Sequence, residues 1–268
     1  MTANMDTPHT SASSSEQAAP AECTNCDAAL ACGMAYCPKC GQSTRVARIT
    51  LREIGDEFMH VLVHVDRSAL SLIRQLLTKP GIVAAEYIAG KRKRYFGPFG
   101  FLVVTVALAS ALIAITGFHA VLTPSDQADD VPNRAAAILQ RHINLVYFAE
   151  VPLLAALCWI MGLRRRPRFN YAEYLVIASY TSGLHMLFFA LLVIPGWFVL
   201  RSRPAIAMDL YFAYLPVWPL YFAFAFAQFL GTPRLWSAIK GFIAVIAALP
   251  ATLYAVSLIA NTYVKIFH

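Results

Sequence analysis

The sequence predicts an all-α polytopic membrane protein with about five transmembrane helices and a small N-terminal four-cysteine zinc ribbon. The 268 residues are 58% hydrophobic and only 14% charged, whereas soluble domains carry about 25% charged residues. Five apolar segments each reach the roughly 20 residues that cross a bilayer. Two CxxC pairs precede these segments. Together these three observations predict the fold class.

Four zones follow one another along the chain. Residues 1–22 lack Lys, Arg and an apolar core, so they do not match a signal peptide and are expected to form a disordered tail. Residues 23–42 form the zinc ribbon, and residues 43–98 form an amphipathic helical juxtamembrane region. Residues 99–268 form the transmembrane domain, with spans expected at 99–118, 143–163, 172–200, 208–231 and 238–262.

The cysteine module reads CTNCDAALACGMAYCPKCGQ. Each CxxC pair can curl into a knuckle whose two thiolates share one metal ion, and two knuckles complete the four-thiolate set that zinc prefers. Four thiolates leave no open coordination position, so the predicted zinc is structural. Cys32 is a spare thiol that could replace a ligand. The predicted ligands are Cys23, Cys26, Cys37 and Cys40.

Charge in the loops predicts the orientation. Basic clusters at 91–94 and 164–168 alternate with loops of mixed charge. The positive-inside rule therefore places the N-terminus in the cytoplasm and the C-terminus in the periplasm, with the spans in a bacterial inner membrane. A cytosolic ribbon argues against a disulfide framework, which needs an oxidising compartment. Unoccupied or redox-active thiols remain the alternative to zinc.

An amphipathic helix is expected over residues 50–78, at the cytosolic side or the membrane interface, because apolar residues recur there at steps of three and four. The pattern TLRE opens it as a capping box, and Pro80 cannot continue it. His60 and His64 lie one turn apart on its polar side, which we interpret as a solvated stripe. A second short helix, PGIVAAEYIAG, is expected to end at Gly90.

Charged side chains also stand beside and inside the spans. KRKRYFGPF places four cations and two aromatic rings before the first span, as an interfacial anchor would. These cations are expected to contact anionic headgroups: Lys91, Arg92, Lys93 and Arg94. Inside the spans, Glu150 and His185 are candidates for an intramembrane polar site, because ionisable groups in hydrocarbon are costly unless paired or wetted. Gln228 is a third unusual polar residue there.

The stretch LLTKPGIVAAEYIAGKRKRYFGPFGFL, together with CPKCGQ, resembles an uncharacterised family of bacterial membrane proteins, domain of unknown function 3667. The resemblance covers about residues 23–110. It implies an N-terminal zinc ribbon, a basic block and several spans, and it implies no activity. We interpret the block as a structural joint, the alternative being recognition of a particular anionic lipid or phosphorylated ligand. The residues that fit the family pattern are Asp66, Pro80, Gly81, Tyr87, Gly90, Lys91, Arg92, Tyr95 and Pro98.

These features favour an adaptor or regulator whose cytosolic ribbon binds a cytosolic or membrane protein partner. The alternative is a small transporter or channel subunit, single or homo-oligomeric, with Glu150 and His185 lining the path. An intramembrane enzyme acting on lipid is less well supported, because no convergent cluster of acids or histidines and no catalytic motif is visible. Nucleic acid is a poor partner for a ribbon whose own stretch is acidic or neutral.

Overall fold

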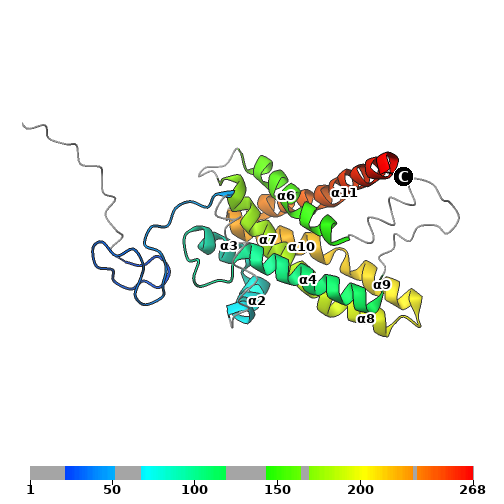
Figure 1. Cartoon of the computed structure of the whole chain (residues 1–268), viewed down its shortest axis with the longest axis horizontal. Coiled ribbons are helices and arrows are strands. Elements are labelled where there is room, and N and C mark those ends of the chain that lie inside the picture. Colours follow the sequence, from blue (N-terminus) through cyan, green and yellow to red (C-terminus); the bar gives the residue numbers. More distant parts are fainter. Residues whose placement is uncertain (1–21, 52–67, 119–142, 164–168, 232–233, 268) are drawn as a thin grey trace, which may run out of the picture.

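The computed structural model describes residues 22–51, 68–118, 143–163, 169–231 and 234–267. The described residues contain helices and no strand (Figure 1), which confirms the predicted all-α fold class. The helical elements are α2 (Ser68–Thr78), α3 (Pro80–Ile88), α4 (Pro98–Thr116), α6 (Ile143–Gly162), α7 (Tyr171–Phe188), the π-helical turn η2 (Phe189–Val193), α8 (Ile194–Val199), α9 (Pro204–Tyr214), α10 (Val217–Leu230) and α11 (Arg234–Phe267).

Two predictions lie wholly or largely outside the described residues. The expected disordered tail falls on residues 1–22, of which only Glu22 is described. The middle of the expected amphipathic helix falls on residues 52–67, and these include His60, His64 and Asp66. Its C-terminal part is α2.

Four helical stretches in the described chain are long and apolar enough to cross a membrane: Pro98–Thr116, Tyr171–Val199, Ala205–Leu230 and Arg234–Ile259. They correspond to the first, third, fourth and fifth predicted spans. The second predicted span forms α6, whose described part Val146–Gly162 belongs to a shorter apolar class. The chain is therefore a multi-pass membrane protein by the length and composition of these helices.

Proline and glycine set several helix ends where the sequence predicts them. Pro80 and Pro98 stand in the first turns of α3 and α4, where the missing proline N–H has no intrahelical partner to lose. Gly90 follows α3 with a φ of 109°, a conformation that glycine adopts without steric cost. The second expected helix and the expected start of the first span are thereby confirmed.

Prolines also interrupt the longer stretches. The third span passes through η2 just before Pro195, consistent with the loss of one backbone donor in that turn. The fourth span consists of α9 and α10, which meet at Leu215 and Pro216. The third and fourth spans are each still long enough to cross the hydrocarbon core.

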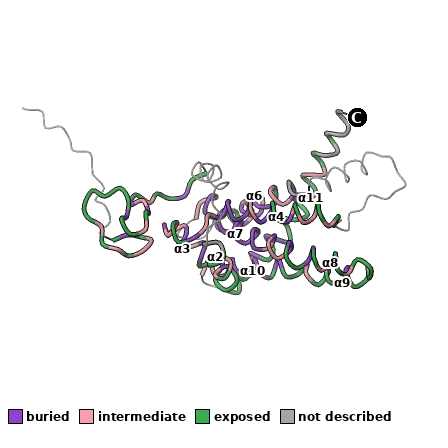
Figure 2. Tube along the Cα trace, turned by 60° about the horizontal axis from the view of Figure 1, so that its bottom comes forward, coloured by how far each residue is buried: buried purple, intermediate pink, exposed green. Residues whose placement is uncertain are grey.

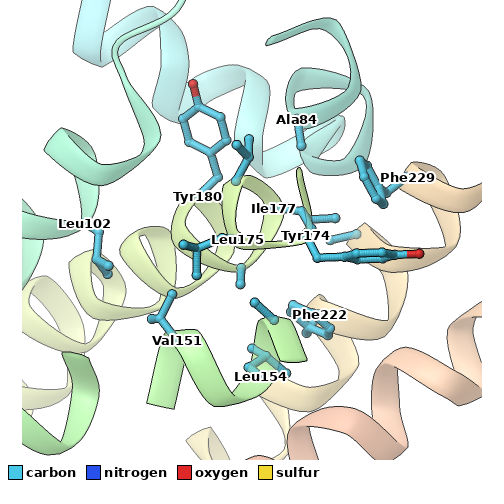
Figure 3. Close-up of a cluster of buried hydrophobic side chains, with 14 of the residues drawn as sticks. Ala84, Leu102, Val151, Leu154, Tyr174, Leu175, Ile177, Tyr180, Phe222 and Phe229 are labelled. Carbon is cyan, nitrogen blue, oxygen red and sulfur yellow. The ribbon is translucent and has the colours of Figure 1, made fainter. Parts of the chain in front are cut away.

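Helix α7 lies at the centre of the bundle. Its side chains are buried along almost its whole length, and Figure 2 shows the buried part of the chain gathered around it. Figure 3 shows Leu102 of α4, Val151 and Leu154 of α6, and Phe222 of α10 converging on this helix. The outward faces instead carry exposed Leu, Ile and Phe side chains, as expected where lipid replaces water.

Helix α3 packs unusually closely on α10. A Cβ at Gly81 would lie 2.3 Å from both the Ala225 carbonyl oxygen and the Phe229 backbone nitrogen. Tyr221 of α10 donates a hydrogen bond to the Leu76 carbonyl at 2.8 Å, which fixes the preceding helix as well. The α2–α3 corner is therefore packed on α10, along the stretch from Tyr221 to Phe229.

Candidate functional site

Four cysteines meet near the N-terminal end of the described chain. All four sulfur atoms, those of Cys23, Cys26, Cys37 and Cys40, lie within 4.8 Å of one another. The Sγ atoms of Cys23 and Cys40 are 3.6 Å apart, and those of Cys26 and Cys37 are 3.7 Å apart. These separations far exceed an S–S bond of about 2.05 Å. They match the edge of about 3.8 Å expected for a tetrahedron with Zn–S bonds of about 2.3 Å.

The two knuckles have the same backbone geometry. The Cys23 carbonyl accepts a hydrogen bond from Asp27 N, as the Cys37 carbonyl accepts one from Gly41 N, both at 2.9 Å. Asp27 and Gly41 also both have positive φ, 56° and 70°. The antiparallel bridges Glu22–Ala29 and Tyr36–Ser43 flank the knuckles in equivalent positions. The chain therefore builds one metal knuckle twice, 14 residues apart, and we call residues 22–44 the cysteine head.

The remaining cysteines in the described chain lie elsewhere. Cys32 is exposed and is not a member of the four-sulfur group. Cys158 is buried in the helical core beside α7. The four predicted ligands thus come together without the spare thiol, and their donor set is compatible with a single tetrahedral metal ion.

The Cys40 sulfur lies beside polar groups that favour its thiolate form. Burial raises the pKa of this thiol, but the Gln42 N–H, the Asn25 side chain and the Cys26 and Cys23 thiols together lower its pKa to about 6. Donors to a ligand sulfur favour its thiolate form and fix its direction. The sequence pattern identifies the ligands, but it gives no signal for these two supporting residues.

The same two residues hold the basic loop, residues 91–94. Gln42 Oε1 accepts a hydrogen bond from Lys93 N at 3.2 Å, and Asn25 Oδ1 accepts one from Arg94 N at 3.1 Å. Arg92 Nη2 donates to the Ala47 carbonyl at 2.7 Å. The cysteine head is therefore anchored on the loop that leads into α4, and Figure 1 shows the head next to this loop at one end of the bundle.

The cations of the basic loop differ in their surroundings. Lys91 Nζ lies 3.0 Å from Glu86 Oε1, and Arg94 Nη1 lies 3.9 Å from Glu86 Oε2. Tyr95 donates a hydrogen bond to the same carboxylate. This hydroxyl, together with the charges of Lys91 and Arg94, lowers the pKa of Glu86. One carboxylate thus faces two of the four cations, and the side chains of Lys93 and Arg94 are exposed.

The chain after the head is tied to the start of α7. Glu173 is buried and receives two hydrogen bonds from Arg48, at 2.7 and 2.8 Å. Asn170 caps α7 through Glu173 N and also donates to the Ile49 carbonyl at 3.0 Å. Glu173 holds the pKa of Arg48 above its usual range through this pairing. The local sequence gives no signal for this contact, since its partners are far apart in the chain, but the NYAE pattern at 170–173 is a signal for the cap.

The intramembrane candidates Glu150 and His185 share a neighbour, Trp218. His185 stacks on Trp218 with ring centroids 4.6 Å apart, and its Nδ1 lies 2.8 Å from Tyr214 Oη. Trp218 also lies beside the Glu150 side chain, without a hydrogen bond of good geometry between them. No hydrogen bond or ion pair joins Glu150 to His185 in the described part of the chain. Among the described residues, none makes a hydrogen bond of good geometry with the buried atoms Glu150 Oε1 and Trp218 Nε1.

Part of the chain is similar to a known protein family. No curated protein and no solved structure matches the chain. Residues 71–109 match the sequence profile of a family described as "Protein of unknown function (DUF3667)". The matched stretch runs from α2 through α3 and the basic loop into α4, and it leaves out the cysteine head. Over these residues the chain is similar to this family of unknown function, as the basic block predicts.

Proposed function

We propose that this protein is a multi-pass protein of a bacterial inner membrane that acts as an adaptor or regulator, using a zinc-loaded cytosolic head to bind a protein partner. The four apolar helices support the membrane assignment. The basic loop contacts the head directly, and by the positive-inside rule the end of the bundle that carries it faces the cytoplasm. Five crossings would then leave the C-terminus in the periplasm.

Zinc is the metal that fits this donor set best. Four soft thiolates in a tetrahedral arrangement favour zinc or an iron–sulfur centre over hard cations such as magnesium or calcium. The S···S separations of 3.6 and 3.7 Å fit one ion at the centre of the four sulfurs. Because the head has few apolar residues to bury, the metal would provide much of its folding free energy.

The observation that carries the adaptor role is the exposed loop between the knuckles. Residues 31–36, ACGMAY, are exposed along their whole length, and Met34 and Tyr36 are 38% and 67% exposed. Asn25 and Gln42, by contrast, are engaged with the basic loop. Tyrosine and methionine are enriched in protein interfaces. The head thus attaches to its own membrane domain and leaves a small apolar surface for a partner protein.

Crosslinking in native membranes followed by affinity recovery tests this role. The double variant Met34→Ser, Tyr36→Ser is expected to keep one zinc per chain and to lose a co-purifying protein that the unchanged chain retains. Lys39→Gln, also exposed in the head, is the matched control and should retain that protein. A Cys37→Ser, Cys40→Ser variant should lose zinc and partner together. Recovery of the same partners from all four proteins would exclude the adaptor role.

A second candidate function is transport, and Glu150 favours it. Glu150 has a buried carboxyl oxygen that no described residue meets with a hydrogen bond of good geometry, and it lies beside the stacked His185 and Trp218. Such a group is typical of ion and substrate paths in membranes. Proteoliposomes that contain the full chain would be tested for cation flux. Glu150→Gln is expected to abolish flux while the Met34→Ser, Tyr36→Ser variant keeps it; equal flux in protein-free vesicles would exclude this candidate.

A further inference from the structure

The residues that support the metal site are also the residues that hold the basic loop. Asn25 lies within the first knuckle, between the ligands Cys23 and Cys26. The Gln42 carbonyl accepts a hydrogen bond from Cys37 N at 2.8 Å, which closes the second knuckle. The side-chain oxygens of Asn25 and Gln42 accept hydrogen bonds from the backbone of consecutive loop residues, Arg94 and Lys93. Each of the two residues thus connects one knuckle to the loop. We call the pair Asn25 and Gln42 the latch.

The contact between head and loop is also close at the end of α3. A Cβ on Gly90 would lie 2.8 Å from Val46 Cγ1 and 3.5 Å from Thr24 Oγ1. Gly90 therefore permits Val46, two residues after the cysteine head, and Thr24 within it to pack next to the start of the loop. The latch is one part of an extended contact, and its geometry depends on the fold of the knuckles.

The loop held in this way carries excess positive charge. Two of its four cations, Lys91 and Arg94, contact one carboxylate, that of Glu86. The side chains of Lys93 and Arg94 extend into solvent from backbone positions that the latch fixes. The loop enters the membrane-spanning α4 within a few residues, so these two cations stand at the depth of lipid phosphates. Each basic residue near an anionic membrane surface contributes about 1 kcal/mol to binding.

We propose that the basic loop binds the phosphate of an anionic phospholipid through Lys93 and Arg94, and that metal in the four-cysteine site holds the loop in its binding form. With metal bound, both knuckles are fixed and the latch holds two consecutive backbone N–H groups. Without metal, the two knuckles are no longer held together, so Asn25 and Gln42 no longer fix the backbone of the loop. Lipid binding must then order the side chains of Lys93 and Arg94. This role does not depend on the protein partner of the preceding section.

The test uses purified full-length protein in detergent and native mass spectrometry with phosphatidylglycerol, against phosphatidylcholine with the same acyl chains. The unchanged protein is expected to prefer phosphatidylglycerol. Lys93→Gln, Arg94→Gln should reduce that affinity by about tenfold or more, since two cations of about 1 kcal/mol each are removed. Arg201→Gln, Arg203→Gln removes two exposed cations from another loop and should leave it unchanged.

Metal dependence is tested with a chelator and with the latch variant Asn25→Ala, Gln42→Ala. Chelation should lower the phosphatidylglycerol affinity of the unchanged protein by about threefold to tenfold, the effect of ordering one or two side chains. The latch variant retains all four cysteines, so its zinc content, measured directly, should stay at one per chain. Its affinity should already be low and should not respond to the chelator.

Three results would overturn the proposal. Equal affinity of the unchanged protein for the two lipids would remove the lipid site. A chelator effect of the same size in the latch variant and the unchanged protein would remove the coupling through Asn25 and Gln42. Competition by inorganic phosphate at the concentration of the lipid would assign the loop to free phosphate rather than to a headgroup.

Discussion

Gln228 Oε1 in α10 accepts a hydrogen bond from the Gly81 backbone N–H at 3.2 Å, while its Nε2 donates to the Thr78 carbonyl at 3.1 Å. Thr78 is the last residue of α2, and Gly81 lies in the first turn of α3. These are backbone groups that a helix leaves unpaired at its ends. Gln228, the polar side chain in the fourth predicted span, therefore pairs with unpaired backbone groups at the α2–α3 corner. This corner lies within the stretch similar to DUF3667.

Replacing Gln228 with Met is expected to destabilise the protein by about 1–3 kcal/mol, the cost of a buried polar group without a partner. Methionine keeps the length of the side chain but cannot bond to Thr78 or Gly81. Thermal unfolding in detergent measures the effect. Leu220→Met, on an exposed face of the same helix, is the control and should not change the melting temperature. An unchanged midpoint for Gln228→Met would mean that water satisfies this corner.

Gly81→Ala is expected to separate α3 from α10. The new Cβ would stand 2.3 Å from two backbone atoms, those of Ala225 and Phe229, and backbone cannot turn aside as a side chain can. Overpacking of this kind costs about 1–3 kcal/mol. Gly196→Ala is the matched control, because its new Cβ would meet only the flexible end of Leu210 at 2.7 Å. Equal unfolding temperatures for the two variants would show that the α3–α10 contact is looser than these distances indicate.

The Glu86 network makes the joint sensitive to acid. Hydrogen bonding from Tyr95 and the charges of Lys91 and Arg94 lower the pKa of Glu86 below its ordinary value of 4.5. A carboxyl with a lowered folded-state pKa stabilises the fold above the ordinary value, and this contribution is lost as the pH falls below it. At alkaline pH, burial and Glu86 raise the pKa of Tyr95 to about 12. That contribution is complete below pH 10 and is lost as the pH rises toward 12.

Glu86→Gln tests the loss of stability at acid pH, because glutamine accepts the Tyr95 hydrogen bond but does not titrate. At pH 7 the variant should unfold about 2 °C below the unchanged protein, the shift that corresponds to less than 1 kcal/mol in a chain of this size. The difference should shrink steadily between pH 4.5 and pH 3. A difference that stays constant over this range would show that the carboxylate charge does not stabilise the joint.

Much of the architecture could be predicted from local pattern, for local physical reasons. Pro80, Gly90 and Pro98 restrict the backbone at their own positions, so the ends of α3 and the start of α4 follow from them. The four ligands follow from CxxC spacing, since each pair shares one turn. These features require no knowledge of the rest of the chain.

The contacts that connect these elements could not be predicted in this way. Asn25 of the latch bonds to Arg94, which is 69 residues away in the chain. Arg48, just after the head, bonds to Glu173, which is 125 residues away. Nothing in the local pattern distinguishes Asn25 from any polar residue in a knuckle. Trp218, which stacks on His185 and lies beside Glu150, could not be predicted either, because an aromatic side chain in a span is ordinarily part of the core.

Glu150 offers the clearest separation of stability from function. Its Oε1 is buried and has no hydrogen-bond partner in the part of the chain that the structure describes, and a side chain of this kind costs about 1–3 kcal/mol relative to an apolar one of similar shape. Glu150→Leu should therefore raise the unfolding temperature, whereas Glu150→Gln, which keeps a polar group at the site, should change it little. A group that lowers stability persists where activity requires it, so the same Leu variant should lose flux in proteoliposomes if the transport candidate holds. A Leu variant that unfolds earlier than the unchanged protein would mean instead that the carboxyl has a bound partner in the membrane, and its role would be structural.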